Sequence, residues 1–500
     1  MIGAGVSGLY AAWGLRTRGA SSALGREPTV EVFEQSGRLG GRLYSVVPPR
    51  APHLRAELGG MRYLPSQTIV SSLIDTLGLA TRPFPITSEK NLVHLRGTTM
   101  RVSELSDPGR SLPYQLREGE RGAGPTELIG RAIIEHIPDC LEFSRSDWPA
   151  VKASREVMGR PLTDLSLRSL LDDTLSPDAV QLAAMGEGYE TFLRDYNAAD
   201  AIQILLSLVT QDYRTPVDGY QALPLALAEA FTKSGGTVTT GTRLITLERA
   251  SGRRTRCILD TGGEISAVDA QAVILAIPRA AIEALDQTSF LFDSRETRAD
   301  ISAVAPVPAS KLFLAFDEPW WEEIAGDHGN LATDLPLRQV VYFGHEGDGG
   351  PGLLLASYNN SFSTWYWEAE ADRGGPYFAG PAAPDSEALA PIEMVADARN
   401  KLQQAYGRPV PEPYWAAFRD WNRPPYGGGW SQWRVGARSY EIMPRIRAPL
   451  PGRRVYICGD TWSDMQGWVD GALSTAERVL QDHLGVPAPE WLPTGTQLGP

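Results

Sequence analysis

The sequence predicts a mixed α/β fold built from more than one structural unit. A glycine-rich turn near the N-terminus opens a helix and leads to a strand, residues 125–212 have an almost wholly helical pattern, and strand patterns dominate residues 237–277 and 309–367. Strands and helices arranged in this way favour sheets that carry helices on their faces. A chain of 500 residues with 42% hydrophobic residues is long enough to form several domains.

The first predicted element is a helix at residues 6–18, because VSGLYAAWGLRTR carries apolar side chains at helical spacing and Gly19 can end it. Residues 29–34 (TVEVFE) alternate as a strand does. A helix followed by a strand is the order of a βαβ unit, so we expect a Rossmann-like domain. Only Met1 and Ile2 precede the glycine turn, so the first strand of that unit is nearly absent.

The remaining elements follow in chain order. After a polar loop at 117–124, runs such as LRSLLDDTL and AIQILLSLV have helical spacing. Strand patterns follow at TVTTGTRLITLE, TRCILD and AVILAIP, and again at KLFLAF, QVVYF and LLLASY. We then expect a helix at 392–406, a strand at 453–458, a helix at 469–483 and a frayed, proline-rich end at 485–500.

Composition excludes several classes of protein. The net charge of −13 argues against non-specific binding to nucleic acid or to an anionic membrane. Cys140, Cys257 and Cys458 are far apart and the six histidines are scattered, so neither a disulfide framework nor a metal site is expected. No run reaches the roughly 18 apolar residues of a membrane span, and no signal peptide precedes the glycine turn. We therefore expect a soluble, cytoplasmic protein.

The N-terminal turn has the form of a dinucleotide-binding loop. Gly3, Gly5 and Gly8 give G-A-G-V-S-G at the start of a helix. Glycines there allow a tight turn, close approach of the backbone to a pyrophosphate, and close helix packing. Glu34 ends the next strand and can accept hydrogen bonds from a ribose. A second G-x-G-x-x-G match at 347–352 leads into a strand, so it lacks the helix N-terminus that holds a phosphate.

Further motifs in a fixed order carry a family resemblance. The glycine turn is followed by S-G-R-L-G-G-R at 36–42 and A-E-L-G-G-M-R at 56–62. VDGYQALPLAL, VILAIP and YICGDTWSDMQGWVDGAL come later in the chain. Together these pieces resemble the flavin amine oxidases, a family that includes monoamine, polyamine and L-amino acid oxidases. The likeness spans most of the chain and is more specific than any one motif.

The resemblance implies FAD as the cofactor. Gly40, Gly41 and Arg42 would bring backbone N–H groups and a positive charge to its pyrophosphate. Asp460 would reach the ribityl chain or the pyrophosphate, and the strand near Leu244 would line the adenine. No cysteine of the C-terminal flavin turn stands where we expect a thioether, so binding should be non-covalent. The other residues expected at the cofactor are Gly60, Met61, Arg62, Gly459, Gly467, Trp468 and Val469.

The resemblance also implies a division of the chain into domains. Residues 1–50, 213–284 and 440–486 would form a discontinuous, Rossmann-like FAD-binding domain. Residues 51–104 and 285–439 would form a mixed-sheet substrate-binding domain. Residues 105–212 would be a helical insertion, and 487–500 a tail.

Among these oxidases, Arg62 in G-G-M-R-Y is the most informative residue. The arginine of the matching motif in L-amino acid oxidases grips the substrate carboxylate, which a planar guanidinium can do bidentately. The alternative is that Arg62 pairs with an internal carboxylate such as Glu57. By the same resemblance, Tyr358 would contact the carboxylate or close an aromatic cage that Trp468 faces, and the Gly467 carbonyl would accept from the substrate amino group.

The predicted reaction is the oxidative deamination of L-amino acids, with an apolar, aromatic or broad side-chain range. Lys311 would hold a water near flavin N5, and its charge would favour electron transfer to O2; the alternative is a solvent-facing lysine. The products would be a 2-oxo acid, ammonia and hydrogen peroxide. A monoamine or polyamine oxidase, an L-amino acid 2-monooxygenase and a non-enzymatic flavin-binding scaffold remain alternatives. We expect a homodimer.

Overall fold

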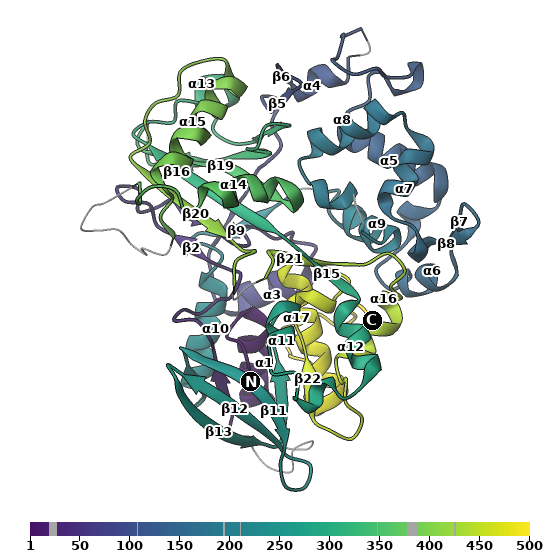
Figure 1. Cartoon of the computed structure of the whole chain (residues 1–500), viewed down its shortest axis with the longest axis vertical. Coiled ribbons are helices and arrows are strands. Elements are labelled where there is room, and N and C mark those ends of the chain that lie inside the picture. Colours follow the sequence, from purple (N-terminus) through teal and green to yellow (C-terminus); the bar gives the residue numbers. More distant parts are fainter. Residues whose placement is uncertain are drawn as a thin grey trace.

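Three main sheets and a block of helices make up most of the molecule (Figure 1), which confirms the predicted mixed α/β class. The computed structural model describes residues 1–19, 28–107, 109–193, 196–210, 212–347, 349–377, 388–424 and 427–500. No helix in these ranges is both long and apolar enough to span a lipid bilayer.

A parallel sheet at the base of the molecule carries the N-terminal turn. Its central position is occupied by Ile2, which forms parallel bridges to Phe33 on one side and to Leu275 on the other. The nearly absent first strand is therefore a short extended segment with strand neighbours on both sides. The order across the sheet is β10 (Thr237–Thr239), β1 (Glu31–Phe33), Ile2, β14 (Val273–Leu275) and β22 (Val455–Ile457).

Helices pack against this sheet. Helix α1 (Val6–Thr17) matches the helix predicted at 6–18, and Gly19 follows it in the left-handed region at φ 79°. Helix α1 contacts both α10 (Ala222–Lys233) and α17 (Val469–Arg478). The helix predicted at 469–483 is confirmed as α17 and the π-helical turn that continues it to His483.

The predicted fraying of residues 485–500 is wrong. Val486 and Leu498 are buried, and Trp491 packs edge-on against Tyr10 with ring centroids 6.3 Å apart. Arg145 donates to the Gln497 carbonyl at 3.0 Å. Apolar side chains spaced between the prolines hold this tail on the hydrophobic core around α1 and α17.

A three-stranded antiparallel sheet follows α10, made of β11 (Thr242–Arg249), β12 (Thr255–Thr261) and β13 (Glu264–Ala270). Strands β11 and β12 were predicted and β13 was not. Strand β13 is exposed along most of its length, so its sequence has no alternating apolar face to indicate a strand.

The upper sheet is mixed and contains a fully buried strand. All eight residues of β16 are buried, and it lies between two antiparallel neighbours, whereas β17 and β5 pair in parallel. The second G-x-G-x-x-G match lies between β18 and β19, and β19 begins at Gly352, so it opens no helix. The order is β20 (Trp415–Asp420), β16 (Ala309–Phe316), β19 (Gly352–Asn360), β18 (Gln339–His345), β17 (Asn330–Thr333), β5 (Leu92–Leu95) and β6 (Thr98–Arg101).

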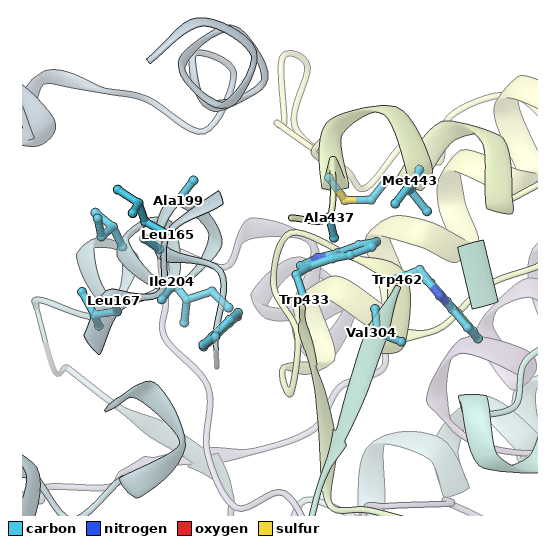
Figure 2. Packing of buried hydrophobic residues seen from close by; sticks show 14 of the residues in the cluster. Leu165, Leu167, Ala199, Ile204, Val304, Trp433, Ala437, Met443 and Trp462 are labelled. Atoms are coloured by element: carbon cyan, nitrogen blue, oxygen red, sulfur yellow. The ribbon is translucent and has the colours of Figure 1, made fainter. Parts of the chain in front are cut away.

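The segment 125–212, predicted to be almost wholly helical, is mainly helical but also contains the short hairpin of β7 (Glu156–Val157) and β8 (Arg160–Pro161). This helical block shares a hydrophobic core with the rest of the chain. Its helices are α5 (Pro125–His136), α6 (Trp148–Ser154), α7 (Leu167–Thr174), α8 (Pro177–Glu187) and α9 (Ala198–Ser207). Figure 2 shows side chains of this block opposite side chains from β15 (Val304–Val307), β21 (Trp430–Trp433) and the segments that follow β21. This continuous core joins the helical block to the sheet that carries the cofactor turn.

Smaller elements complete the fold. The helix predicted at 392–406 is confirmed as α15 (Ile392–Tyr406). The others are β2 (Ser45–Val46), β3 (Ala56–Glu57), α3 (Thr68–Thr76), β4 (Thr81–Pro83), α4 (Val102–Leu105), β7 (Glu156–Val157), β8 (Arg160–Pro161), β9 (Arg214–Pro216), α11 (Arg279–Glu283), α12 (Arg295–Ser302), α13 (Glu322–Ala325), α14 (Thr364–Glu370) and α16 (Ser439–Ile446).

Candidate active site

A long cleft runs from the N-terminal glycine turn to the buried strand β16, and the space between its walls, including the part open to solvent, is about 1500 Å³. It brings together residues that lie more than 400 positions apart in the chain. The predicted site residues that line it are Gly3, Gly5, Glu34, Gly40, Gly41, Arg42, Gly60, Met61, Arg62, Lys311, Tyr358, Gly459, Asp460, Gly467, Trp468 and Val469.

The glycines at one end of the cleft differ in what surrounds them. A Cβ on Gly8 would lie 2.0 Å from the Gly3 carbonyl oxygen, so Gly8 allows α1 to pack directly on the turn. Gly8 itself does not line the cleft. A Cβ on Gly5 would meet no atom within 4 Å and would project into open space. The backbone at Gly5 is therefore accessible to a ligand, as a pyrophosphate site requires.

Glu34 is held in place beside this turn. Its carboxylate accepts hydrogen bonds from the backbone N–H of Ala4 at 2.8 Å and from the N–H and hydroxyl of Ser36 at 2.9 and 2.7 Å. A carboxylate can accept further hydrogen bonds. Its place on the cleft wall at the end of β1 fits a ribose hydroxyl as the ligand group.

A second turn approaches the first from across the cleft. The N–H of Gly40 donates to the Ala4 carbonyl at 3.0 Å, and both Gly40 and Gly41 have positive φ angles. Arg42 forms an ion pair with Asp460, whose carboxylate also accepts from the Gly467 N–H at 3.1 Å. The arginine expected at the pyrophosphate is thus linked to the aspartate expected at the ribityl chain.

Two buried hydroxyls also indicate that the cleft holds a polar ligand. The hydroxyls of Tyr220 and Thr461 are buried in its wall and have no hydrogen-bond partner in the part of the chain that the structure describes. Buried polar atoms normally find a partner, so these two hydroxyls indicate a bound group. No cysteine or histidine is among the described residues that line the cleft, and Cys458 is buried in the adjoining core.

Lys311 lies at the other end of the cleft, in strand β16 of the upper sheet. It is only 4% exposed, which excludes a solvent-facing lysine. Its ammonium group donates to the carbonyls of Glu57 at 3.0 Å and Gly59 at 2.5 Å, and lies 4.8 Å from the centre of the Tyr358 ring. Burial lowers the pKa of Lys311, the charge of Glu57 opposes this, and the charge of Arg62 lowers the pKa further.

Glu57 does not pair with Arg62. Its carboxylate accepts from the Ser45 hydroxyl at 2.8 Å and from the Tyr220 N–H at 2.8 Å. Burial raises the pKa of Glu57, and these two hydrogen bonds and the charge of Lys311 counteract the rise. Glu57 therefore belongs to the wall behind Lys311 and is not the partner of Arg62.

The Arg62 guanidinium faces the cleft among aromatic rings. Its central carbon lies 4.1 Å from the Tyr213 ring centre and 5.9 Å from that of Phe84. Tyr213 stacks in turn on Trp468, with centroids 6.2 Å apart and an angle of 10° between the planes. Within the described ranges, no carboxylate pairs with Arg62. The geometry leaves its N–H donors for a ligand.

Sequence reasoning missed three aromatic residues here and, besides Gly8, expected one further residue that does not line the cleft. Tyr189, Tyr213 and Phe84 belong to no motif, and the sequence offers no signal that distinguishes them from core aromatics. Leu244 lies in β11, is buried in the hydrophobic core and is not part of the cleft wall.

The chain is similar to known proteins over most of its length. The profile of a family described as flavin-containing amine oxidoreductases matches residues 6–482. The chain is 27% identical to achacin from Lissachatina fulica over 516 residues, covering 97% of this chain and 92% of achacin. It is 26% identical to the L-amino-acid oxidase of Mus musculus, covering 96% and 69%. Wild-type putrescine oxidase bound to putrescine has the same fold, with a TM-score of 0.69 and 20% identity over 97% of this chain and 98% of that one.

Proposed function

The chain belongs to the family of flavin-containing amine oxidoreductases, which use FAD, and on that premise we propose that it is an L-amino acid oxidase. It oxidises an L-amino acid with O2 and water to a 2-oxo acid, ammonia and hydrogen peroxide. Its substrates carry apolar or aromatic side chains or span a broad range. Two relatives support this assignment: an L-amino-acid oxidase from mouse and a putative one from Bacillus subtilis, 24% identical to this chain.

The proposal rests mainly on the surroundings of the Arg62 guanidinium. A half-buried guanidinium in the cleft wall, stacked on Tyr213 and without a carboxylate partner among the described residues, has N–H donors available for a ligand of opposite charge. A substrate carboxylate accepts from them in bidentate geometry. A simple amine would leave this charge uncompensated, and a substrate ammonium would be repelled by it.

The substrate end of the cleft can perform three tasks. Arg62 holds the carboxylate and so fixes the direction of the Cα–H bond, which is an orientation effect. Trp468 and Tyr358 flank the same space as apolar walls that exclude water. When bound, FAD would supply the acceptor for the electron pair that leaves the Cα–H bond and the electrons for the reduction of O2. The positive charge of Lys311 favours the charge that develops when O2 is reduced.

The test is a substrate and product panel with the purified holoprotein. L-phenylalanine, L-leucine and L-glutamine should release peroxide, whereas D-phenylalanine and phenethylamine should not. Each turnover should yield one 2-oxo acid and one ammonia. Equal oxidation of phenethylamine would replace the proposal with an amine oxidase, and a carboxamide product would replace it with a decarboxylating monooxygenase.

A further inference from the structure

The helical block sends a short segment back into the active site. After α8 ends at Glu187, residues 188–191 cross to the upper sheet, and Tyr189 becomes part of the cleft wall. Gly188 adopts a left-handed conformation at φ 83°, and a Cβ there would lie 2.5 Å from the Gln339 side chain. The segment therefore lies directly against β18.

Side chains of the upper sheet hold this segment in place. The Gly188 carbonyl accepts from the amides of Gln339 at 3.2 Å and Asn360 at 3.4 Å. The Thr191 N–H donates to Asn360 at 3.1 Å. Every one of these bonds joins the helical block to the sheet that carries Lys311 and Tyr358.

An ion pair adds to this anchoring. Arg338 is 2% exposed and contacts the Glu190 carboxylate at 3.2 Å. It adopts a left-handed backbone conformation at φ 57°, which is rare for a residue with a side chain. A buried arginine in a strained conformation, beside a cleft residue, points to a positional requirement for its neighbour Tyr189.

Tyr189 meets the residues that surround Arg62. Its ring packs edge-on against Tyr358, with centroids 5.8 Å apart and an angle of 89° between the planes. Burial raises the pKa of Tyr358, Tyr189 raises it further, and Arg62 opposes the rise. Burial raises the pKa of Tyr213 as well, with Arg62 opposing and Tyr189 adding to the rise. Tyr189 thus lies against Tyr358 and near Tyr213, on which the Arg62 guanidinium stacks.

We propose that Tyr189 completes the carboxylate site, with its hydroxyl donating to a substrate carboxylate that Arg62 binds. This inference rests on the proposed function. A carboxylate has about four lone-pair directions, of which a bidentate guanidinium uses two. A phenol that lines the same cleft can satisfy part of the remaining lone-pair directions. The helical block therefore contributes a substrate-binding residue, and Arg338 is the positioning residue that keeps it there.

The test uses the holoenzyme and two probes of nearly the same shape, benzoate and benzamide, titrated through the flavin absorbance. The parent should bind benzoate more tightly than benzamide. Tyr189→Phe keeps the ring and removes only the hydroxyl. The affinity of this variant for benzoate should therefore fall by roughly tenfold to a hundredfold, the loss expected for a hydrogen bond to a charged group. Its affinity for benzamide should not change, and KM for L-phenylalanine should rise more than kcat falls.

Two variants complete the experiment. Arg338→Met should reproduce the selective loss of benzoate binding. The control is Tyr366→Phe, because Tyr366 is a half-exposed tyrosine of α14 outside the cleft; this variant should keep the parent's affinity for both probes. Parent-like benzoate affinity in Tyr189→Phe would overturn the role of Tyr189 while leaving the proposed function intact. A parent that binds both probes equally and oxidises phenethylamine would show instead that the proposed function, and with it the carboxylate site, is wrong.

Discussion

The two ends of the cleft are built in different ways. At the nucleotide end, backbone groups of two turns within residues 3–42 meet each other, as in the bond from Gly40 to Ala4. At the substrate end, the functional groups are side chains from remote segments: Arg62, Lys311 and Trp468. The first end depends on the absence of side chains at a few positions, and the second on the presence of particular ones.

The contrast predicts which substitutions should damage each end of the cleft. A backbone site is damaged by any side chain that enters it, whatever its chemistry. A side-chain site is damaged by loss of one charge even when the fold is unchanged. Substitutions at the substrate end should therefore alter the rate without altering stability, and substitutions in the glycine turns should alter cofactor binding or folding.

The largest effect is expected for Arg62→Ala. Losing one partner of a buried charge pair typically costs about 3–5 kcal/mol, so kcat/KM for L-phenylalanine should fall by roughly 10²–10³ or more. Arg62→Lys should recover only part of this, because an ammonium cannot match the bidentate geometry. Steady-state kinetics measure both.

A matched control for this prediction is Arg50→Ala. Arg50 also stacks on a tyrosine, 4.6 Å from the Tyr414 ring centre, but its side chain is 58% exposed. Its removal should leave kcat/KM unchanged. An intact rate in Arg62→Ala would show that the carboxylate is bound elsewhere.

The next largest effect should follow Lys311→Met. Loss of its charge should slow the reaction of reduced enzyme with O2 by about tenfold to a hundredfold, and should slow flavin reduction much less. Stopped-flow measurement of the two half-reactions separates them. Lys401→Met is the control, because its ammonium also lies 4.8 Å from a tyrosine ring, that of Tyr366, outside the cleft.

The pH dependence sharpens the Lys311 prediction. Since burial lowers the pKa of Lys311 below its ordinary value of 10.5, its positive charge is lost as pH rises through that lowered value. Reoxidation of the parent should therefore slow with rising pH, and the Lys311→Met variant should lack this dependence. Equal reoxidation rates in variant and parent would remove Lys311 from the reaction.

Two glycine substitutions probe the nucleotide end. Gly8→Ala should lower the free energy of unfolding by about 1–3 kcal/mol through overpacking, because its Cβ would clash with the Gly3 carbonyl. Gly5→Ala should change stability by no more than about 1 kcal/mol but weaken FAD binding by roughly tenfold, the equivalent of about 1.4 kcal/mol. Thermal unfolding of the apoprotein and FAD titration check both. Undiminished FAD affinity in Gly5→Ala would place the pyrophosphate elsewhere.

The smallest effect concerns covalent attachment, where we expect none. The described wall of the cleft contains no cysteine or histidine, and Cys458 lies in the core. Acid precipitation should therefore leave the flavin in the supernatant. Colour that stays in the protein pellet would contradict non-covalent binding.

Much of the nucleotide end was predictable from the sequence, because it is a local structure. The spacing of Gly3, Gly5 and Gly8 and the helix that follows depend on residues close in the chain, and the structure has the helix as predicted. The prediction that residues 485–500 are frayed was wrong because their structure is not local. Its order comes from tertiary contacts, such as that of Trp491 with Tyr10, which local sequence does not encode.

The mixed α/β class, the family resemblance and the residue types available for chemistry could all be predicted from the sequence. Which of these residues meet depends on the tertiary structure. Lys311 is buried in β16, and Arg62 has no carboxylate partner among the residues that the structure describes. Tyr189, from the helical block, packs against Tyr358. Helical and strand patterns arise from neighbours along the chain, whereas these encounters depend on packing between segments hundreds of residues apart, for which no local pattern exists.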